Sequence, residues 1–127
     1  MSEAQAVALW CAAASLAISF GSSAQEKVSG DALFRQQCAI CHAVVKDEPH
    51  RQGPTLWGVV GRKAGSFADF PYSPAFKKAM KGKVWSEALI DRWINDPQAL
   101  ARGTTMGYQQ ADPEKRAAII EYLKTLK

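Results

Sequence analysis

The segment Cys38-Ala39-Ile40-Cys41-His42 restricts what this chain can become more than any other stretch of it. Two thiols three positions apart lie on the same face of one helical turn, so both sulfurs can reach the two vinyl groups on one edge of a porphyrin. The imidazole that follows then projects beneath the ring, where its nitrogen can bind iron. The spacing therefore predicts one covalently attached c-type haem, with His42 as an axial ligand.

Two other uses of paired cysteines fit the sequence less well. A redox-active Cys-x-x-Cys pair belongs in a βαβ setting, and the neighbouring residues have no such pattern. A zinc site needs a second pair of ligands, whereas the only other cysteine is Cys11. Haem attachment remains the favoured interpretation.

Residues 1–24 have the composition of an export signal. The stretch from Ala4 to Phe20 is almost entirely small or apolar, and small residues at Gly21 to Ala24 suit a signal peptidase. Cleavage after Ala24 would leave residues 25–127 as a single domain. The first residues contain Glu3 but no Lys or Arg, so an uncleaved membrane anchor is the alternative. About 17 apolar residues are short for a membrane span.

The predicted mature segment carries a mild positive charge. Only Glu3 among the 12 acidic residues lies in the leader, which leaves a net charge of +5 for residues 25–127. This charge suits docking to an acidic protein surface, whereas nucleic-acid binding would need basic residues gathered on one element with aromatic residues between them. The lysines from Lys77 to Lys83 are interpreted as a solvated face, with a partner-binding patch as the alternative.

The remaining pattern predicts an all-α domain of about four helices. Start signals stand at Ser29, Ser73-Pro74, Ser86 and Asp112-Pro113. The first helix should carry both cysteines, the second should cover residues 75–81, and Pro97 should end the third. Segments 43–70 and 98–111 lack periodicity, and such long loops suit a small domain when they wrap a large apolar ligand. Haem would then form much of the core.

The residue on the face of the iron opposite His42 decides between an electron carrier and a catalyst. Met1 leaves with the leader, His50 falls on the same side of the ring as His42, and Met80 lies on the lysine-rich helix where packing explains it. Met106 is favoured because it lies in an irregular segment between two glycines, where its thioether can be directed at a metal. A His/Met pair raises the reduction potential and leaves no open coordination position, which suits electron transfer.

At this point the sequence resembles the class I cytochromes c, from about Gly30 to Leu126. The motifs that carry the resemblance are Cys38-Ala39-Ile40-Cys41-His42, Gly53-Pro54-Thr55-Leu56, Gly61-Arg62-Lys63-Ala64-Gly65, Trp85, Asp96-Pro97, Gly103-Thr104-Thr105-Met106 and Tyr122-Leu123-Lys124. They occur in the order of that family and near its spacing.

The resemblance implies roles for residues that the pattern alone leaves unassigned. It implies that Met106 is the sixth ligand and that the carbonyl of Pro54 accepts the ring N–H of His42. Four positions match groups that hydrogen-bond the haem propionates: Arg62, Tyr72, Trp85 and Thr104. The resemblance also implies that the first and last helices cross at Gly30 and Phe34, against Tyr122.

Several positions depart from the family pattern. Arg102 stands where proline is usual, which predicts a Met106 loop that opens more easily. Trp93 stands where tyrosine is often found near the methionine sulfur. Many relatives have lysines around the exposed haem edge at four positions that here are Gln37, Gln98, Ala99 and Thr105. The identity of the partner therefore cannot be carried over from the family.

Together these features predict a monomeric, periplasmic one-electron carrier that is not an enzyme. Export fits because bacteria join haem to cysteines outside the cytoplasm. The expected partners are redox proteins such as a membrane cytochrome complex, a dehydrogenase, an oxidase or a reductase. Nucleic acid is not expected, and membrane association is expected only if the leader is kept. The alternatives are a haem enzyme or gas sensor in which Met106 is displaced, and a dedicated subunit of one dehydrogenase.

Overall fold

The structure, a computed structural model, describes residues 27–127. The predicted leader, its cleavage site after Ala24 and Cys11 lie outside the described residues. Five helices form in this part of the chain: α1 (Gly30–Gln37), α2 (Pro74–Met80), α3 (Glu87–Asn95), α4 (Pro97–Leu100) and α5 (Pro113–Lys124). Its β pairing is limited to one antiparallel bridge between Lys63 and Val84. The predicted all-α class is confirmed, and none of these helices is both long and apolar enough to cross a membrane.

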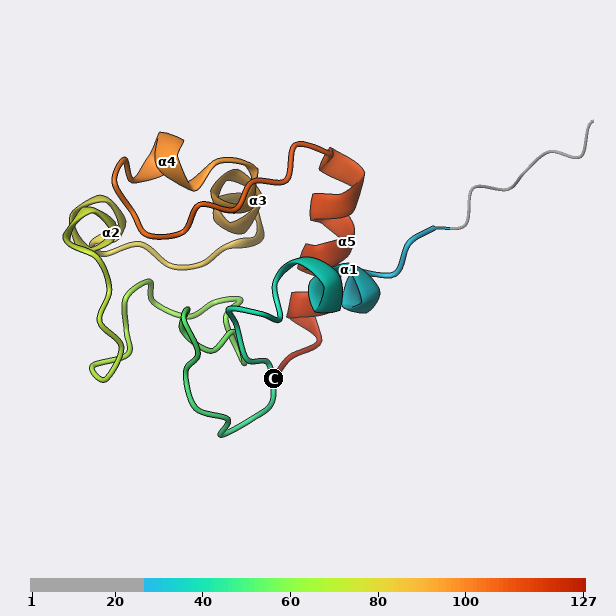
Figure 1. Ribbon diagram of the computed structural model, residues 1–127, viewed down its shortest axis with the longest axis horizontal. Helices are drawn as coiled ribbons and strands as arrows, with labels where there is room; N and C mark the ends of the chain where they lie inside the picture. Colours follow the sequence, from blue (N-terminus) through green and yellow to red (C-terminus); the bar gives the residue numbers. More distant parts are fainter. Residues whose placement is uncertain (1–26) are drawn as a thin grey trace, which may run out of the picture.

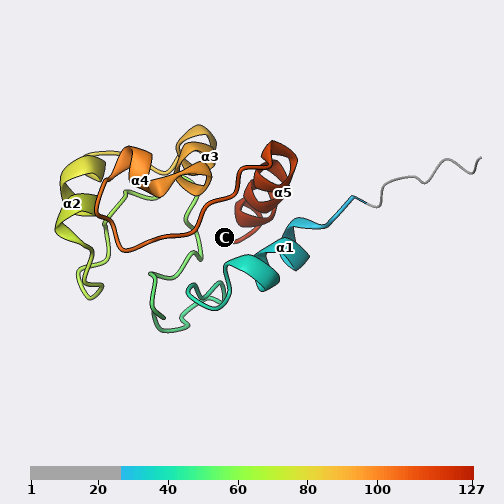
Figure 2. The same cartoon turned by 45° about the horizontal axis from the view of Figure 1, so that its top comes forward.

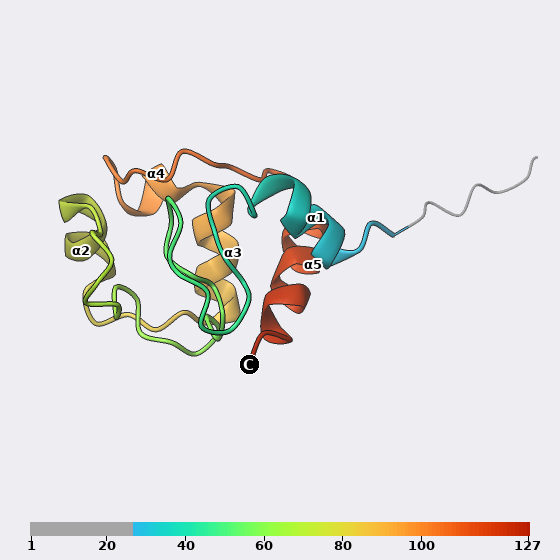
Figure 3. The same cartoon turned by 60° about the horizontal axis from the view of Figure 1, so that its bottom comes forward.

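Helices α1 and α5 cross at a very close contact, visible in Figures 1 and 3. A Cβ atom on Gly30 would lie 1.9 Å from the carbonyl oxygen of Ala118, so only glycine fits there. One turn later, Phe34 is 1% exposed and its ring centroid lies 5.5 Å from that of Tyr122. The predicted crossing is therefore confirmed, and it fixes the direction in which α1 delivers the chain to the two cysteines.

Three of the four predicted helix starts have the expected caps. The side chain of Ser73 accepts a hydrogen bond from Phe76 N, that of Ser86 from Leu89 N, and that of Asp112 from Glu114 N. Ser29 is the N-cap residue of α1 as predicted, but its side chain makes no capping hydrogen bond. The neighbouring Ser29 side chain, and to a smaller degree Arg35, lower the pKa of Asp31.

Helix α2 covers Pro74–Met80 rather than the predicted residues 75–81, and the segment after α3 also differs from the sequence prediction. Segment 98–111, predicted to be irregular, begins inside α4, because the Asp96 carboxylate accepts hydrogen bonds from Gln98 N at 3.0 Å and Ala99 N at 3.2 Å. Pro97 follows the end of α3 as predicted, but it also supplies the first residue of α4.

Helix α1 ends one turn earlier than predicted. The carbonyl of Phe34 accepts from both Cys38 N and Ala39 N, which stops the regular hydrogen-bond pattern there. The two cysteines therefore lie in the turn after α1 rather than within it. The turn keeps a helical shape, since Cys41 N and His42 N both donate to the carbonyl of Cys38 at 3.0 Å.

Two segments without α-helix lie on opposite sides of the domain. In Figure 1, residues 43–72 occupy the lower half and residues 101–112 run across the upper half on their way to α5; in Figure 2, residues 101–112 pass below α4 and α3. The helices share a buried core that includes Phe34, Phe76, Met80, Trp93 and Ile119. The lower segment follows His42 directly and the upper one contains Met106, so the two predicted ligands come from opposite sides.

Candidate haem-binding site

The two cysteines lie at the surface in the turn after α1. Both are free thiols with partly exposed side chains, and Ile40 between them is 85% exposed. Burial, with a smaller effect of the neighbouring Cys41 thiol, raises the pKa of Cys38 to about 11. The Cys41 sulfur lies 3.4 Å from the Gln52 side-chain oxygen. A porphyrin joined to both sulfurs would therefore keep one edge close to solvent.

The His42 imidazole is oriented by the backbone of Pro54. Its Nδ1 lies 2.7 Å from the Pro54 carbonyl oxygen, which assigns the proton to Nδ1 and leaves the Nε2 lone pair available. Burial lowers the pKa of His42, an effect that the bond to Pro54 opposes and Arg62 reinforces. The ring is therefore held neutral in the tautomer that a metal binds through Nε2.

Gly53 completes the support of this imidazole. A Cβ at position 53 would lie 2.3 Å from Cε1 and 2.7 Å from Nδ1 of His42. Gly53 N also donates to the Cys41 carbonyl at 2.7 Å, which binds the segment against the attachment turn. The backbone thus lies directly against the ring, and any side chain here would displace it.

The Met106 sulfur has a hydrogen-bond donor of its own. The indole Nε1 of Trp93 donates to it at 3.1 Å, and Trp93 is a buried residue of α3. A thioether sulfur has two lone pairs, so this bond leaves one for a metal. Trp93 therefore places a hydrogen-bond donor beside the sulfur.

The other two described candidates for the sixth ligand, Met80 and His50, make contacts that explain them without a metal. Met80 is 2% exposed and belongs to the core cluster. His50 Nδ1 accepts a hydrogen bond from Thr55 N at 3.0 Å, so its Nε2 carries the proton that faces the Asp69 carboxylate at 3.2 Å. These contacts match the interpretation of His50 as a loop residue that bonds locally.

Arg62 is a half-buried cation bonded to neutral groups. Its guanidinium donates to the carbonyls of Trp57 at 2.8 Å and Thr55 at 2.9 Å, and it lies 4.4 Å from the Phe67 ring centroid. None of the ion pairs formed within residues 27–127 involves it. Burial lowers the pKa of Arg62. A carboxylate placed beside it would supply the partner that a half-buried charge needs.

Two of the other three predicted propionate donors, Tyr72 and Trp85, lie near Arg62, and Thr104 contacts Ser73. Tyr72 OH accepts from Phe67 N at 3.4 Å, and burial raises the pKa of Tyr72. Trp85 is 8% exposed, and its backbone N donates to the Arg62 carbonyl at 2.9 Å. Thr104, also 8% exposed, lies next to Ser73, with 3.5 Å between the hydroxyl oxygens.

The residues present fit a covalently bound haem. Two thiols are available to join the porphyrin, the oriented imidazole and the thioether are the candidate iron ligands, and Gly53 lets the backbone lie against the imidazole, where a Cβ would collide with it. Sequence reasoning missed the contribution of Gln98, whose side chain bonds the backbone of Met106 itself. A single glutamine before an irregular segment gives no pattern by which it could have been found.

This fold and this donor set define a class I cytochrome c. The family model named Cytochrome c matches residues 28–127, and the chain belongs to that family. It therefore carries one haem c, bound through Cys38 and Cys41.

The relatives include proteins named cytochrome c2 and cytochrome c. The chain is 44% identical over 103 residues to cytochrome c2 of Rhodopila globiformis, covering 80% of this chain and 94% of that protein. It is 34% identical over 102 residues to cytochrome c of Nigella damascena, covering 80% and 90%.

Solved structures give the same assignment. Cytochrome c2 from Rhodospirillum centenum superposes with a TM-score of 0.71 at 30% identity, covering 77% of this chain and 95% of that one. Ferricytochrome c2 from Rhodopseudomonas palustris gives 0.68 at 34% identity, covering 77% and 96%.

Proposed function

We propose that this chain is a one-electron carrier in which His42 and Met106 bind the haem iron from opposite faces. The observation that carries the proposal is that each candidate ligand is already held by a second group. Pro54 accepts from His42 Nδ1 at 2.7 Å, and Trp93 donates to the Met106 sulfur at 3.1 Å. Each ligand atom keeps a lone pair for the metal.

The residues then have separate parts in the chemistry. When bound, the haem supplies the ferric–ferrous couple. Met106, a soft thioether ligand, favours the ferrous state and raises the reduction potential. If His42 and Met106 both bind the iron, they would leave no coordination position for oxygen or peroxide. Gly53 and Pro54 keep the imidazole in one orientation in both oxidation states.

Four residues would stabilise the propionates of the buried edge. Arg62, Tyr72, Trp85 and Thr104 are half-buried or buried and offer N–H and O–H donors. A carboxylate near low dielectric is costly without such donors. Through these contacts the chain would also influence the reduction potential, because the guanidinium of Arg62 favours the less positive ferrous state.

The expected setting is the periplasm of a bacterium, with redox proteins as partners. The support comes from two sides: relatives are named cytochrome c2, and the attachment turn presents Ile40 to solvent beside the haem edge. Electrons would leave and enter at that edge, from a membrane cytochrome complex or dehydrogenase to an oxidase or reductase. A monomer without enzymatic activity is sufficient for this role.

Visible spectroscopy of the purified haem protein tests the proposal. The carrier predicts a low-spin ferric spectrum with the methionine–iron charge-transfer band, and a ferrous spectrum that carbon monoxide leaves unchanged at neutral pH. Rapid carbon monoxide binding would instead support a haem enzyme or gas sensor, because the sixth ligand would then be displaceable.

A further inference from the structure

The Met106 segment needs restraints that its own backbone does not supply. Residues 101–112 contain no helix, Gly103 has a positive φ of 90°, and exposed Arg102 stands where proline is usual in the family. A segment with so little local structure would sample open states in which Met106 leaves the iron. Two glutamine side chains from outside the segment make the hydrogen bonds that oppose such opening.

Gln98, in α4, binds the first half of the segment at three points. Its side-chain nitrogen donates to the carbonyls of Thr104 at 2.9 Å and Met106 at 3.2 Å, and its side-chain oxygen accepts from Gly103 N at 2.9 Å. The amide thus bridges the two ends of the Gly103–Met106 stretch. Gln98 is itself held, because its backbone N donates to Asp96 at the capped start of α4.

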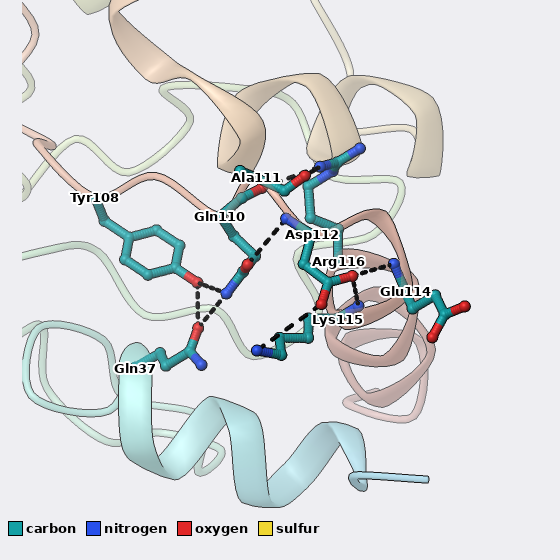
Figure 4. A network of polar contacts seen from close by, with 8 residues as sticks. All are labelled: Gln37, Tyr108, Gln110, Ala111, Asp112, Glu114, Lys115 and Arg116. Carbon is teal, nitrogen blue, oxygen red and sulfur yellow. Dashed lines mark hydrogen bonds and ion pairs between the residues drawn. The ribbon is translucent and has the colours of Figure 1, made fainter. Parts of the chain in front are cut away.

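Gln37 binds the second half from the end of α1, as Figure 4 shows. Its side-chain oxygen accepts from Tyr108 OH at 2.5 Å and from the Gln110 side-chain nitrogen at 2.8 Å. Gln37 immediately precedes Cys38, so these bonds join the Met106 segment directly to the haem-attachment turn.

The far end of the segment is fixed by α5 and α3. Arg116 donates to the carbonyls of Gln110 at 3.0 Å and Ala111 at 2.9 Å, and its Nε bonds Asp91 at 2.8 Å. Gln110 N also donates to the Ile94 carbonyl at 2.8 Å. This end therefore has a rigid anchor, and opening must occur between it and α4, where Gln98 and Gln37 act.

We infer that Gln98 and Gln37 are positioning residues that hold Met106 over the iron, in place of the restraint that proline gives in relatives. The inference rests on the proposed His42/Met106 ligation. Both glutamines occupy positions where relatives have lysines around the haem edge, so this chain uses them as internal supports instead of docking charges. Neither touches the iron. Their loss raises the fraction of molecules in which Met106 is displaced.

The test is titration of the ferric haem protein with imidazole, followed by visible absorbance. Imidazole binds iron only in molecules whose Met106 has left, so its apparent affinity is proportional to the open fraction. Gln98→Ala and Gln37→Ala are each expected to bind imidazole roughly tenfold more tightly than the wild type, since each loses at least two hydrogen bonds. Gln109→Ala is the control, because Gln109 is exposed and within the same segment, and its affinity should stay within about twofold.

A second variant and a second readout separate positioning from general stability. Gln98→Glu keeps the shape and the acceptor oxygen of the side chain but loses the N–H donor. The carbonyls of Thr104 and Met106 then have no partner, so this variant should behave like Gln98→Ala. Amide hydrogen exchange should accelerate in residues 103–110 and stay unchanged in α1 and α5. Exchange that accelerates equally throughout the chain would overturn the positioning role, because the substitutions would then act on the whole fold.

The remaining outcomes distinguish the two proposals. The positioning role would be overturned if three variants bound imidazole with the affinity of the wild type: Gln98→Ala, Gln98→Glu and Gln37→Ala. If the wild type also showed the methionine–iron band, the ligation would still stand. If the wild type lacks that band and Met106→Ala binds imidazole no more tightly than the wild type, the ligation itself fails. The inference about the glutamines falls with it.

Discussion

The indole Nε1 of Trp93 lies 3.1 Å from the sulfur of Met106 and donates its hydrogen to it. A hydrogen bond withdraws electron density from the sulfur and makes it a weaker donor to iron. The ferric state depends more on that donation than the ferrous state does. The bond from α3 is therefore expected to raise the reduction potential.

Trp93→Phe should lower the reduction potential by roughly 20–60 mV, because a net hydrogen bond of about 1 kcal/mol corresponds to about 43 mV for one electron. Trp93→Tyr should recover part of the loss, since a phenol can donate in the same direction. Spectroelectrochemical titration measures both variants. An unchanged potential in Trp93→Phe would mean that the indole serves only as packing.

Gly53→Ala should disturb the proximal side of the haem. The new Cβ would lie 2.3 Å from His42 Cε1, so the imidazole must tilt and its bond to Pro54 must lengthen. We expect a weaker iron–histidine bond and a partial high-spin ferric spectrum. Resonance Raman spectroscopy reports both changes, and a spectrum identical to that of the wild type would show that the loop moves away instead.

Gly30→Ala should destabilise the fold through the crossing of α1 and α5. The added Cβ would lie 1.9 Å from the Ala118 carbonyl, and backbone cannot yield as a side chain does. The free energy of unfolding should fall by about 3 kcal/mol or more. Gly107→Ala is the matched control, because nothing lies within 4 Å of a Cβ there, and it should change stability by less than about 0.5 kcal/mol. Guanidinium denaturation of the haem proteins gives both values.

Arg62→Gln should lower the reduction potential. The loss of a positive charge beside the haem disfavours the ferrous state, and about 1 kcal/mol of lost interaction corresponds to about 43 mV for one electron. The haem propionate that loses its Arg62 partner should also titrate nearer neutrality. The reduction potential would then fall more steeply with pH. Arg62→Lys should keep most of the potential. Equal potentials in Arg62→Gln and the wild type would argue that Arg62 only binds the carbonyls of Thr55 and Trp57.

Much of the fold could be predicted because its signals are local. Ser73, Ser86 and Asp112 each satisfy backbone N–H groups within three residues, so the starts of α2, α3 and α5 can be read directly from the sequence. Helix α4 was missed because four residues, Pro97–Leu100, are too few to show periodicity. The early end of α1 was also missed, since it depends on which amides the Phe34 carbonyl accepts from.

The same difference between local signals and long-range contacts decides how much of the site could be predicted. The spacing of Cys38, Cys41 and His42 predicts haem attachment directly, and the glycines around Met106 make it the favoured candidate for the sixth ligand. The supporting contacts join residues far apart in the chain, such as Gln37 with Tyr108. Only the folded chain brings such partners together, so no spacing in the sequence indicates them.

The ferric spectrum of Met106→Ala tests the proposed ligation of the iron. We predict that the methionine–iron charge-transfer band disappears, that the reduction potential falls, and that the reduced protein binds carbon monoxide rapidly at neutral pH. Met80→Leu, which changes a core methionine of α2, should keep the band. A Met106→Ala spectrum indistinguishable from that of the wild type would show that another group holds the sixth position, and the electron-carrier mechanism described above would be wrong.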